Sequence, residues 1–412
     1  MAQAEHIQFG PKPDPEAPRF HFIANGMFGD GIGGGDVHFF EMAKGVIANG
    51  YRLHFFGSHA LRKAAMERLP AWELTLTEDQ PLPRINDTAF GGHLKLFKSF
   101  GEKCRNTLKY INEIKPHEPV YAATDYWYDA IPLYRCSAAR KIMIVGMDAP
   151  SAKQILFRGR PDVTSLRLNS VHYWSSQNFS LRLFRRCPHK RLFYVHPAMK
   201  ERLLSLGYQE QELAYISNGM DLETAESIPV QEKEFDVIWL GRVHKQKGIE
   251  DLLTTLVHLR DRVPNFRAVL VGRVDVELKP RLTALNLLDC VTLTGKVSEA
   301  EKFRLFKASR IFLMPSYYES WGIVIAESLA CGIPVVAYEL DAYRPIFGGL
   351  LHYVPCFDLN RFSTVAEGAV REARNGQSNL SAESLEQFKQ ANSWNHARTV
   401  FIQGLNSLGS GA

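Results

Sequence analysis

The sequence lacks the features that mark membrane-spanning and exported proteins. None of its apolar stretches approaches the roughly 20 residues needed to cross a bilayer. Residues 1–18 are polar and rich in proline and contain no apolar signal core, so we expect a flexible arm here instead of an export signal. These absences predict a cytoplasmic protein.

Cysteine is scarce and widely scattered. The six cysteines form no CxxC pair and no spacing that is typical of metal ligands. Such a distribution suits reduced, mostly buried thiols. We therefore predict no disulfide and no zinc site.

Acidic residues are almost missing from residues 153–191, which contain nine basic residues and one acid, Asp162. A phosphorylated acceptor, an anionic membrane surface or a nucleic acid would complement this charge, and an ordinary solvated face would look the same. No recognised nucleic-acid-binding module accompanies the segment, so we predict no nucleic-acid partner and favour peripheral association with an anionic membrane. The basic residues are Lys153, Arg158, Arg160, Arg167, Arg182, Arg185, Arg186, Lys190 and Arg191.

The length and the apolar pattern predict two domains. A chain of 412 residues exceeds what one hydrophobic core usually organises. Short apolar runs alternate with helix-like segments, which is typical of parallel sheets with helices on both faces. We therefore predict an α/β fold of two Rossmann-like doubly wound domains that face each other across a cleft. The predicted strands are residues 20–24, 52–56, 120–123, 141–145, 236–240, 268–271, 291–293, 311–314 and 334–337.

Turn residues at 217–221 and a polar stretch after them mark the domain boundary. The organisation that we predict is a flexible arm (1–18), an N-terminal acceptor domain (19–217), a linker (218–234), a C-terminal donor domain (235–390) and a C-terminal helix that packs back towards the N-terminal domain (391–412).

A glycine-rich stretch, residues 31–35, lies between the first predicted strand and the first predicted helix. Glycines at the start of a helix let the backbone approach a phosphate, which the exposed N–H groups favour. A tight turn without a ligand would also use glycine.

Two cations follow the first predicted strand of the second domain. Arg242 comes directly after Gly241, and Lys247 precedes Gly248 at the start of the next helix. Because the carboxyl edge of a parallel sheet is a common ligand site, these cations are well placed to neutralise a diphosphate. Acids are preferred at a helix start, so a solvation pattern explains Lys247 less well than a bound anion does.

Two carboxylates, Glu319 and Glu327, stand eight residues apart after the predicted strand at 311–314. If a helix begins at Trp321 or Gly322, Glu319 precedes its N-terminus and Glu327 lies about two turns inside it. One carboxylate can then face sugar hydroxyls while the other accepts from a ribose diol. A capping glutamate and a surface glutamate are the structural alternatives.

Together these motifs resemble the retaining GT-B glycosyltransferases of family 4, the glycosyl transferases group 1. The resemblance runs in order along nearly the whole chain and is specific in its second half. It rests on Gly33-Gly34, Asn218-Gly219-Met220-Asp221, Gly241-Arg242, Lys247-Gly248, Gly272, Thr294-Gly295-Lys296-Val297, Glu319 with Glu327, and the residues 330–336 that follow.

The resemblance implies a donor site for a nucleotide-diphosphate sugar. Arg242 and Lys247 would hold the diphosphate, Glu319 would face the hexose, and Glu327 would bind the ribose hydroxyls. Val297 would lie near the base. The remaining donor contacts implied are Gly33, Gly34, Gly241, Ser320, Trp321, Gly322, Ile323 and Val324.

The same resemblance implies retention of configuration without a metal, because Arg242, Lys247 and a helix N-terminus would stabilise the leaving group. Many relatives carry a sugar-binding histidine where this chain has Gly146-Met147-Asp148. We therefore expect Asp148 to act in its place. Asp125 is the other acceptor-side candidate, for which an ordinary helix cap is the alternative.

We thus predict a hexosyltransferase that uses a UDP-sugar, or alternatively GDP-mannose, and forms an α-glycosidic bond to a glycan or lipid-linked acceptor in polysaccharide or lipopolysaccharide assembly. One alternative is a transferase of the same fold with a small soluble acceptor. The other is a sugar-nucleotide-binding subunit without turnover, which the missing histidine motivates.

Overall fold

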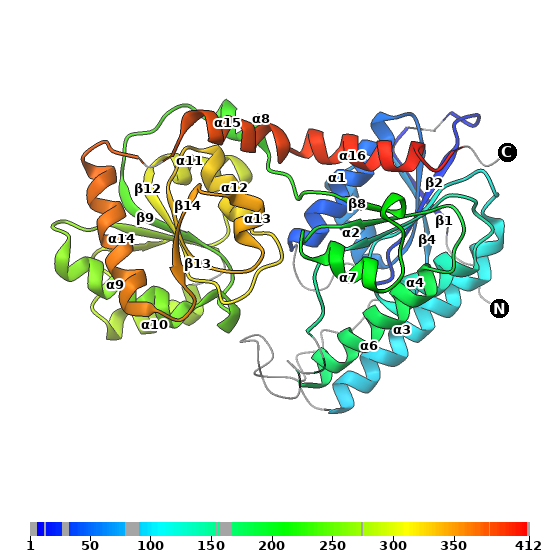
Figure 1. Ribbon diagram of the computed structural model, residues 1–412, viewed down its shortest axis with the longest axis horizontal. Helices are drawn as coiled ribbons and strands as arrows, with labels where there is room; N and C mark the ends of the chain where they lie inside the picture. Colours follow the sequence, from blue (N-terminus) through cyan, green and yellow to red (C-terminus); the bar gives the residue numbers. More distant parts are fainter. Residues whose placement is uncertain are drawn as a thin grey trace. The chain divides into compact units, whose positions relative to one another are not determined.

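The computed structural model describes residues 6–11, 14–26, 33–78, 90–150, 152, 155, 167–272, 275–378 and 380–409. The chain divides into two compact units. Unit 1 contains the described residues from 6 to 155, residues 167–217 and residues 397–409, and unit 2 contains residues 218–396 (Figure 1).

Unit 1 is built on a sheet with the strand order β1-β4-β3-β2-β5-β6-β7-β8. β1 pairs antiparallel with β4, and the other pairs are parallel. The strands are β1 (His6–Phe9), β2 (Arg19–Ile23), β3 (Arg52–Gly57), β4 (Trp72–Leu76), β5 (Val120–Ala122), β6 (Lys141–Val145), β7 (Lys190–Tyr194) and β8 (Leu213–Tyr215). Its helices are α1 (Gly34–Ala48), α2 (His59–Met66), α3 (Phe90–Tyr110), α4 (Trp127–Arg135), α6 (Arg167–Phe184) and α7 (Met199–Ser205).

Unit 2 has a parallel sheet with the order β11-β10-β9-β12-β13-β14. The strands are β9 (Phe235–Leu240), β10 (Ala268–Val271), β11 (Val291–Leu293), β12 (Ser309–Met314), β13 (Val335–Glu339) and β14 (Leu351–Pro355). The helices are α8 (Leu222–Ser227), α9 (Ile249–Arg262), α10 (Asp275–Ala284), α11 (Glu299–Lys307), α12 (Ile323–Ala330), α13 (Tyr343–Phe347), α14 (Leu359–Arg374) and α15 (Ala382–Ala391). α9 and α14 pack together on one face, and α8, α11 and α12 form a group on the other.

Continuous apolar runs explain the central strands of unit 2. Val237 and Trp239 of β9 are fully buried among Leu252 and Leu256 of α9. Strands that are covered on both faces are apolar throughout, which is why the continuous apolar runs alone located them.

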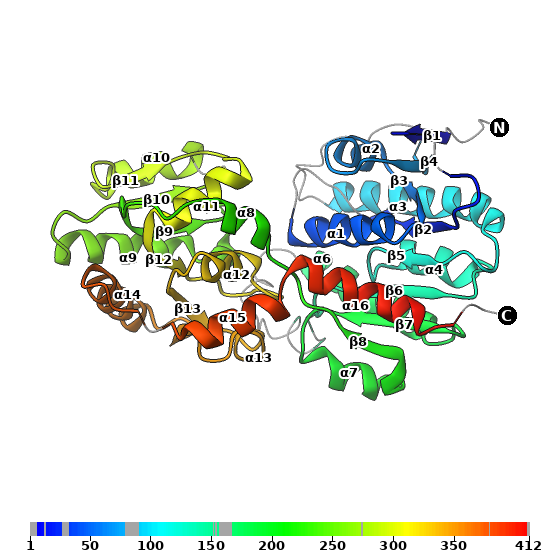
Figure 2. The ribbon, with the colours of Figure 1, turned by 90° about the horizontal axis from the view of Figure 1, so that it is seen from above.

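The last helix, α16 (Trp394–Asn406), belongs to unit 1 from residue 397 onwards. The ring of Phe401 packs on Phe20, Tyr121 and Phe193, with centroid distances of 6.0, 5.2 and 5.3 Å. Arg398 binds Glu41 of α1 at 3.0 Å, and α16 runs beside α1 in Figure 2. The end of the chain therefore completes the core of unit 1.

Two segments differ from the predicted organisation. The stretch 218–234 contains α8, which packs on α11 and α12 within unit 2. The stretch 391–396 also falls in unit 2, where Met220 and Ser393 form a β-bridge.

A chain of buried polar groups crosses the first strands of unit 1. His21 Nε2 lies 3.1 Å from Glu118, and His21 Nδ1 lies 3.0 Å from His54 Nδ1. His54 Nε2 lies 3.0 Å from the hydroxyl of Thr75, which contacts His6. Burial and then the neighbouring His21 hold the pKa of His54 well below its ordinary value.

Candidate functional site

The loops that carry the predicted donor residues meet at the topological switch point of unit 2. β9 lies between β10 and β12, so the chain leaves β9 towards one edge of the sheet and reaches β12 on its other side. Ligands of open α/β sheets bind outside the carboxyl ends of the strands at such a point. The loop after β9 holds Gly241, Arg242 and Lys247, and the loop after β12 holds Glu319.

Gly248 allows these two loops to touch. Its φ is +63°, and a Cβ added there would lie 1.9 Å from the carbonyl oxygen of Pro315. Beside it, the backbone N–H of Tyr317 donates to the Gln246 carbonyl at 2.8 Å, and the Gln246 side chain donates to the Tyr318 carbonyl at 2.7 Å. A side chain at position 248 would therefore separate the loop of Lys247 from the loop of Glu319.

Lys247 and Glu319 form an ion pair across this contact. The Nζ of Lys247 lies 2.5 Å from Oε1 of Glu319, and their side chains are 17% and 14% exposed. The resemblance implies that Lys247 binds the diphosphate and Glu319 faces the hexose, and the structure brings the two side chains together. Each neutralises the other at the switch point. A ligand with a negative diphosphate and a polar sugar could replace Glu319 as the partner of Lys247 and Lys247 as the partner of Glu319.

Two other residues predicted for the donor site also follow strands of this sheet. Arg242 is exposed just after β9, and Val297 is half-buried in the loop between β11 and α11. The carboxyl ends of β9, β10 and β11 are linked by backbone bonds from Gly241 to Val271 and from Gly272 to Gly295. These residues share one edge of the sheet.

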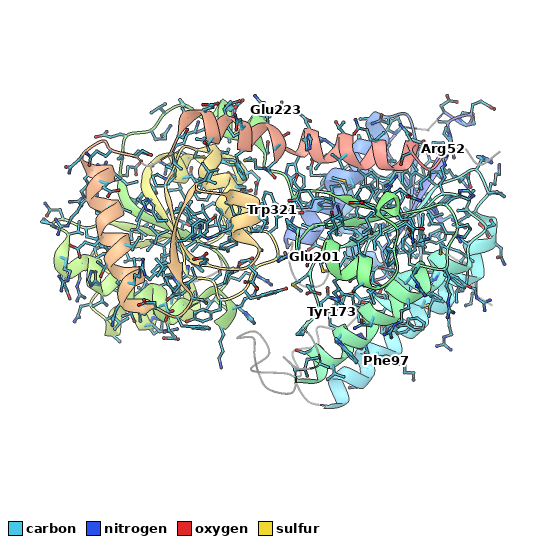
Figure 3. The ribbon with its side chains drawn as sticks, viewed as in Figure 1. Arg52, Phe97, Tyr173, Glu201, Glu223 and Trp321 are labelled. Atoms are coloured by element: carbon cyan, nitrogen blue, oxygen red, sulfur yellow. The ribbon has the colours of Figure 1, made fainter. Side chains whose placement is uncertain are left out.

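The helix predicted to begin at Trp321 or Gly322 begins one residue later, with Gly322 as its N-cap. Ser320, Ile323 and Val324 are partly exposed at this helix start. Trp321, labelled in Figure 3, is fully buried and packs edge-on against Phe347 at 5.7 Å. Its indole therefore anchors the loop, and only its backbone remains suited to a ligand.

Glu327 lies in the second turn of α12 and is 7% exposed. Its Oε1 accepts from the Nζ of Lys302 on α11 at 2.7 Å. Lys302 also binds Glu299 at 2.6 Å. Lys302 is not among the residues predicted from the sequence.

On unit 1, the two residues expected on the acceptor side follow neighbouring strands. Asp125 follows β5, and Asp148 follows β6. Gln177 of α6 joins them: its Nε2 donates to Asp125 at 2.6 Å, and its Oε1 accepts from Arg202 at 2.8 Å. Arg202 in turn forms an ion pair with Asp148, whose side chain is 43% exposed.

Burial dominates the electrostatics of Asp125. Its burial raises the pKa to about 6, against hydrogen bonds from Gln177 and Tyr173 that lower it. Asp129 of α4 is also buried, which raises its pKa to about 7 although Thr124 and the Asn25 amide donate to it. Carboxyls with a pKa near neutrality are suited to proton transfer.

The glycine-rich motif is described only in part. Gly33 caps α1, and its N–H donates to Asp36 at 2.6 Å. Gly34 is the first residue of that helix. Gly31 and Ile32 lie outside the described residues, as do Lys153, Arg158 and Arg160 of the basic segment and the side chain of Arg167.

The described part of the basic segment is divided between the surface and the interior. Val171, Trp174 and Phe179 of α6 are 44%, 36% and 48% exposed, and Arg182 on the same helix is exposed, as are Arg185 and Arg186 just after it. Lys190 is buried in β7 and forms an ion pair with Glu212 at 2.5 Å, so it does not belong to a basic surface. Phe97 of neighbouring α3, also labelled in Figure 3, is 50% exposed and contacts His172. No helix in the described parts of the chain is both long and apolar enough to cross a membrane.

Residues 221–348, which contain both loops of the switch point, match the family model described as glycosyl transferases group 1. The match covers 128 of the 412 residues, and it confirms the predicted resemblance to the group 1 glycosyltransferases.

Comparison with solved structures confirms the predicted GT-B fold. The structure of Anabaena HepE in complex with UDP and glucose aligns with a TM-score of 0.67 and 17% identity, over 95% of this chain and 100% of the other. Two curated relatives match over a more limited part of the sequence. The D-inositol 3-phosphate glycosyltransferase of Arthrobacter sp. strain FB24 is 34% identical over 123 residues, and the phosphatidyl-myo-inositol mannosyltransferase of Mycobacterium leprae is 32% identical over 151. These matches cover 28% and 35% of this chain, and 29% and 40% of the relatives, so the chain spans less than half the length of either.

Proposed function

We propose that this group 1 glycosyltransferase moves a hexose from a nucleotide-diphosphate sugar to a glycan or lipid-linked acceptor, with retention of configuration and without a metal. The observation that carries the proposal is the Lys247–Glu319 pair at the switch point of unit 2. One charge suits the departing diphosphate and the other suits sugar hydroxyls.

In the proposed reaction the diphosphate draws Lys247 and Arg242 to its oxygens. Glu319, released from Lys247, accepts hydrogen bonds from the hexose, and the amides at the start of α12 add donors. The bond between the anomeric carbon and the diphosphate breaks while the acceptor oxygen bonds to the same face. The donor phosphate takes the acceptor proton, so stabilisation of the leaving group supplies most of the catalysis.

A UDP-sugar is the donor we favour, with GDP-mannose as the alternative. The structure of Anabaena HepE, which shares the fold, holds UDP and glucose. A lipid-linked acceptor is supported by the name of the Mycobacterium leprae relative, a phosphatidyl-myo-inositol mannosyltransferase. We propose that Asp148 and Asp125 face this acceptor, and that the basic and aromatic face of α6 rests on an anionic membrane that carries it.

The test is thermal unfolding with UDP, GDP and ADP, each with and without chelator. A nucleotide that binds only the folded protein raises its unfolding temperature. We expect UDP to stabilise the parent protein in the presence of chelator. Arg242→Ala should abolish this stabilisation, and Arg361→Ala, which removes an equal charge from an exposed position of α14, should not. No stabilisation by any nucleotide would overturn the proposal, and stabilisation that chelator abolishes would overturn its metal-independence.

A further inference from the structure

The ion pair between Lys302 and Glu327 is almost completely buried. Lys302 is 8% exposed and Glu327 is 7% exposed, and the two residues come from different helices, α11 and α12. The ammonium of Lys302 also lies 4.7 Å from the ring centroid of Phe303. The burial of Lys302 and its contacts with Glu327 and Phe303 therefore hold both its apolar stem and its ammonium group in place.

Stability alone is a poor reason for such a pair. Removing two charges from water costs several kcal/mol per ion, and well-packed apolar residues often replace a buried pair without loss. Lys302 is moreover held from two sides, because Glu299 binds it from one turn earlier on α11 with a side chain that is 67% exposed. The geometry therefore fixes the direction of the Glu327 carboxylate.

Lys302 is the cation that offsets an otherwise acidic surrounding. Burial raises the pKa of Glu327, Lys302 opposes this rise, and the carboxylates of Glu299 and Asp221 add to it. Asp221 precedes α8 and is itself bound by Thr224.

Cys331, the C-cap of α12, is a further titratable neighbour. Burial raises the pKa of its thiol to about 12, although Lys307 of α11 and Lys389 of α15 oppose this rise, so the thiol is uncharged at neutral pH. Without Lys302, Glu327 would lose the cation that opposes this rise, and its pKa would be higher still.

We propose that Lys302 is a positioning residue that holds the Glu327 carboxylate as an acceptor for both ribose hydroxyls of the donor nucleotide. The inference rests on the proposed function, in which Glu327 binds the ribose. A carboxylate has about four lone-pair sites, so one bond from Lys302 leaves sites for two hydroxyls. A protonated carboxyl would present a donor where an acceptor is needed.

This role makes Lys302 a determinant of selectivity for ribonucleotides over 2′-deoxyribonucleotides. A hydrogen bond to a charged group corresponds to about tenfold in affinity. The parent protein should therefore bind UDP about tenfold more tightly than 2′-deoxy-UDP.

The experiment is calorimetric titration of the full chain with both nucleotides at about pH 6 and about pH 8. In Lys302→Met the preference should fall to about twofold, and the fall should be larger at the lower pH, where more of the carboxyl is protonated. Lys302→Arg, which keeps the charge, and Glu299→Gln, which removes only the exposed carboxylate, should keep the parent preference at both pH values. Should Lys302→Met not fold, Lys302→Gln, which retains a donor of similar length, carries the same expectation.

The outcomes separate this inference from the function on which it rests. A Lys302→Met variant that keeps the tenfold preference at both pH values would overturn the role of Lys302 and leave the donor site intact. A parent that binds both nucleotides equally would also overturn it while supporting the function. A parent that binds neither nucleotide would overturn both.

Discussion

Gly248→Ala should damage the donor site by a steric route that a matched glycine can isolate. Gly248 and Gly376 have nearly the same backbone, with φ of +63° and +73°. An added Cβ at Gly248 would lie 1.9 Å from the Pro315 carbonyl oxygen, whereas at Gly376 nothing lies within 4 Å. The two substitutions therefore share the left-handed strain and differ in the clash.

The expected magnitudes follow from these contacts. Left-handed alanine costs about 1–2 kcal/mol at either position. At Gly248 the backbone must also move by about 1.5 Å to restore normal contact, which breaks the two hydrogen bonds between Gln246 and residues 317–318 at about 1 kcal/mol each. We expect a loss of about 4 kcal/mol for Gly248→Ala and about 1.5 kcal/mol for Gly376→Ala.

Thermal unfolding and UDP titration would measure this difference. In a unit of this size these losses correspond to about 10 °C and about 4 °C in the unfolding temperature. Gly248→Ala should also lose UDP binding, because Lys247 moves with the loop, and Gly376→Ala should keep it. Equal losses of stability in the two variants would refute the argument that the loop of Lys247 is pressed against the loop of Glu319.

Two further predictions concern unit 1. The pKa of His54 lies well below its ordinary value, mainly through burial and then through His21, so below about pH 6.5 the unfolded chain binds a proton that the folded chain does not. Urea unfolding should therefore show the free energy of unfolding falling by up to about 1.4 kcal/mol per pH unit as the pH is lowered from about 6.5 to 5. A His54→Gln variant with the same pH slope as the parent would argue against this. Replacing both Phe97 and Trp174 by serine should reduce sedimentation with anionic phosphatidylglycerol vesicles several-fold, since about 25 cal/mol of binding free energy is lost per Å² of apolar surface. The control Met66→Ser, at an exposed position of α2, should sediment like the parent protein. Unchanged binding of the double variant would remove α6 as the membrane-binding face.

The central strands of unit 2 were predictable because they are buried on both faces. The predicted range 268–271 coincides with β10, and the predicted range 311–314 lies within β12. Position after a buried strand also predicted that Arg242, Lys247 and Glu319 would share one edge of the sheet. The pairing of Lys247 with Glu319 was not predictable, because it depends on the close approach that Gly248 permits.

The elements that sequence analysis missed depend on tertiary contacts. β1 has four residues, and its antiparallel pairing with β4 joins segments some 65 residues apart. α8 buries a single alanine, Ala225, so its short sequence carries no helical apolar pattern. It was therefore predicted as part of a linker.

The same limit hid functional candidates. Lys302 follows Glu299 by three residues, and such a pair is typical of an exposed helix surface. Its burial arises only when α11 packs beside α12. Gln177, which links Asp125 to the Arg202–Asp148 pair, likewise reaches across from a distant helix.

The position of Phe401 in the core of unit 1 bears on how the protein is made. During synthesis, residues 397–409 leave the ribosome after every residue of unit 2, so unit 2 can fold while unit 1 still lacks the ring that packs on Phe20, Tyr121 and Phe193. The core of unit 1 therefore stays incomplete until residues 397–409 have been made.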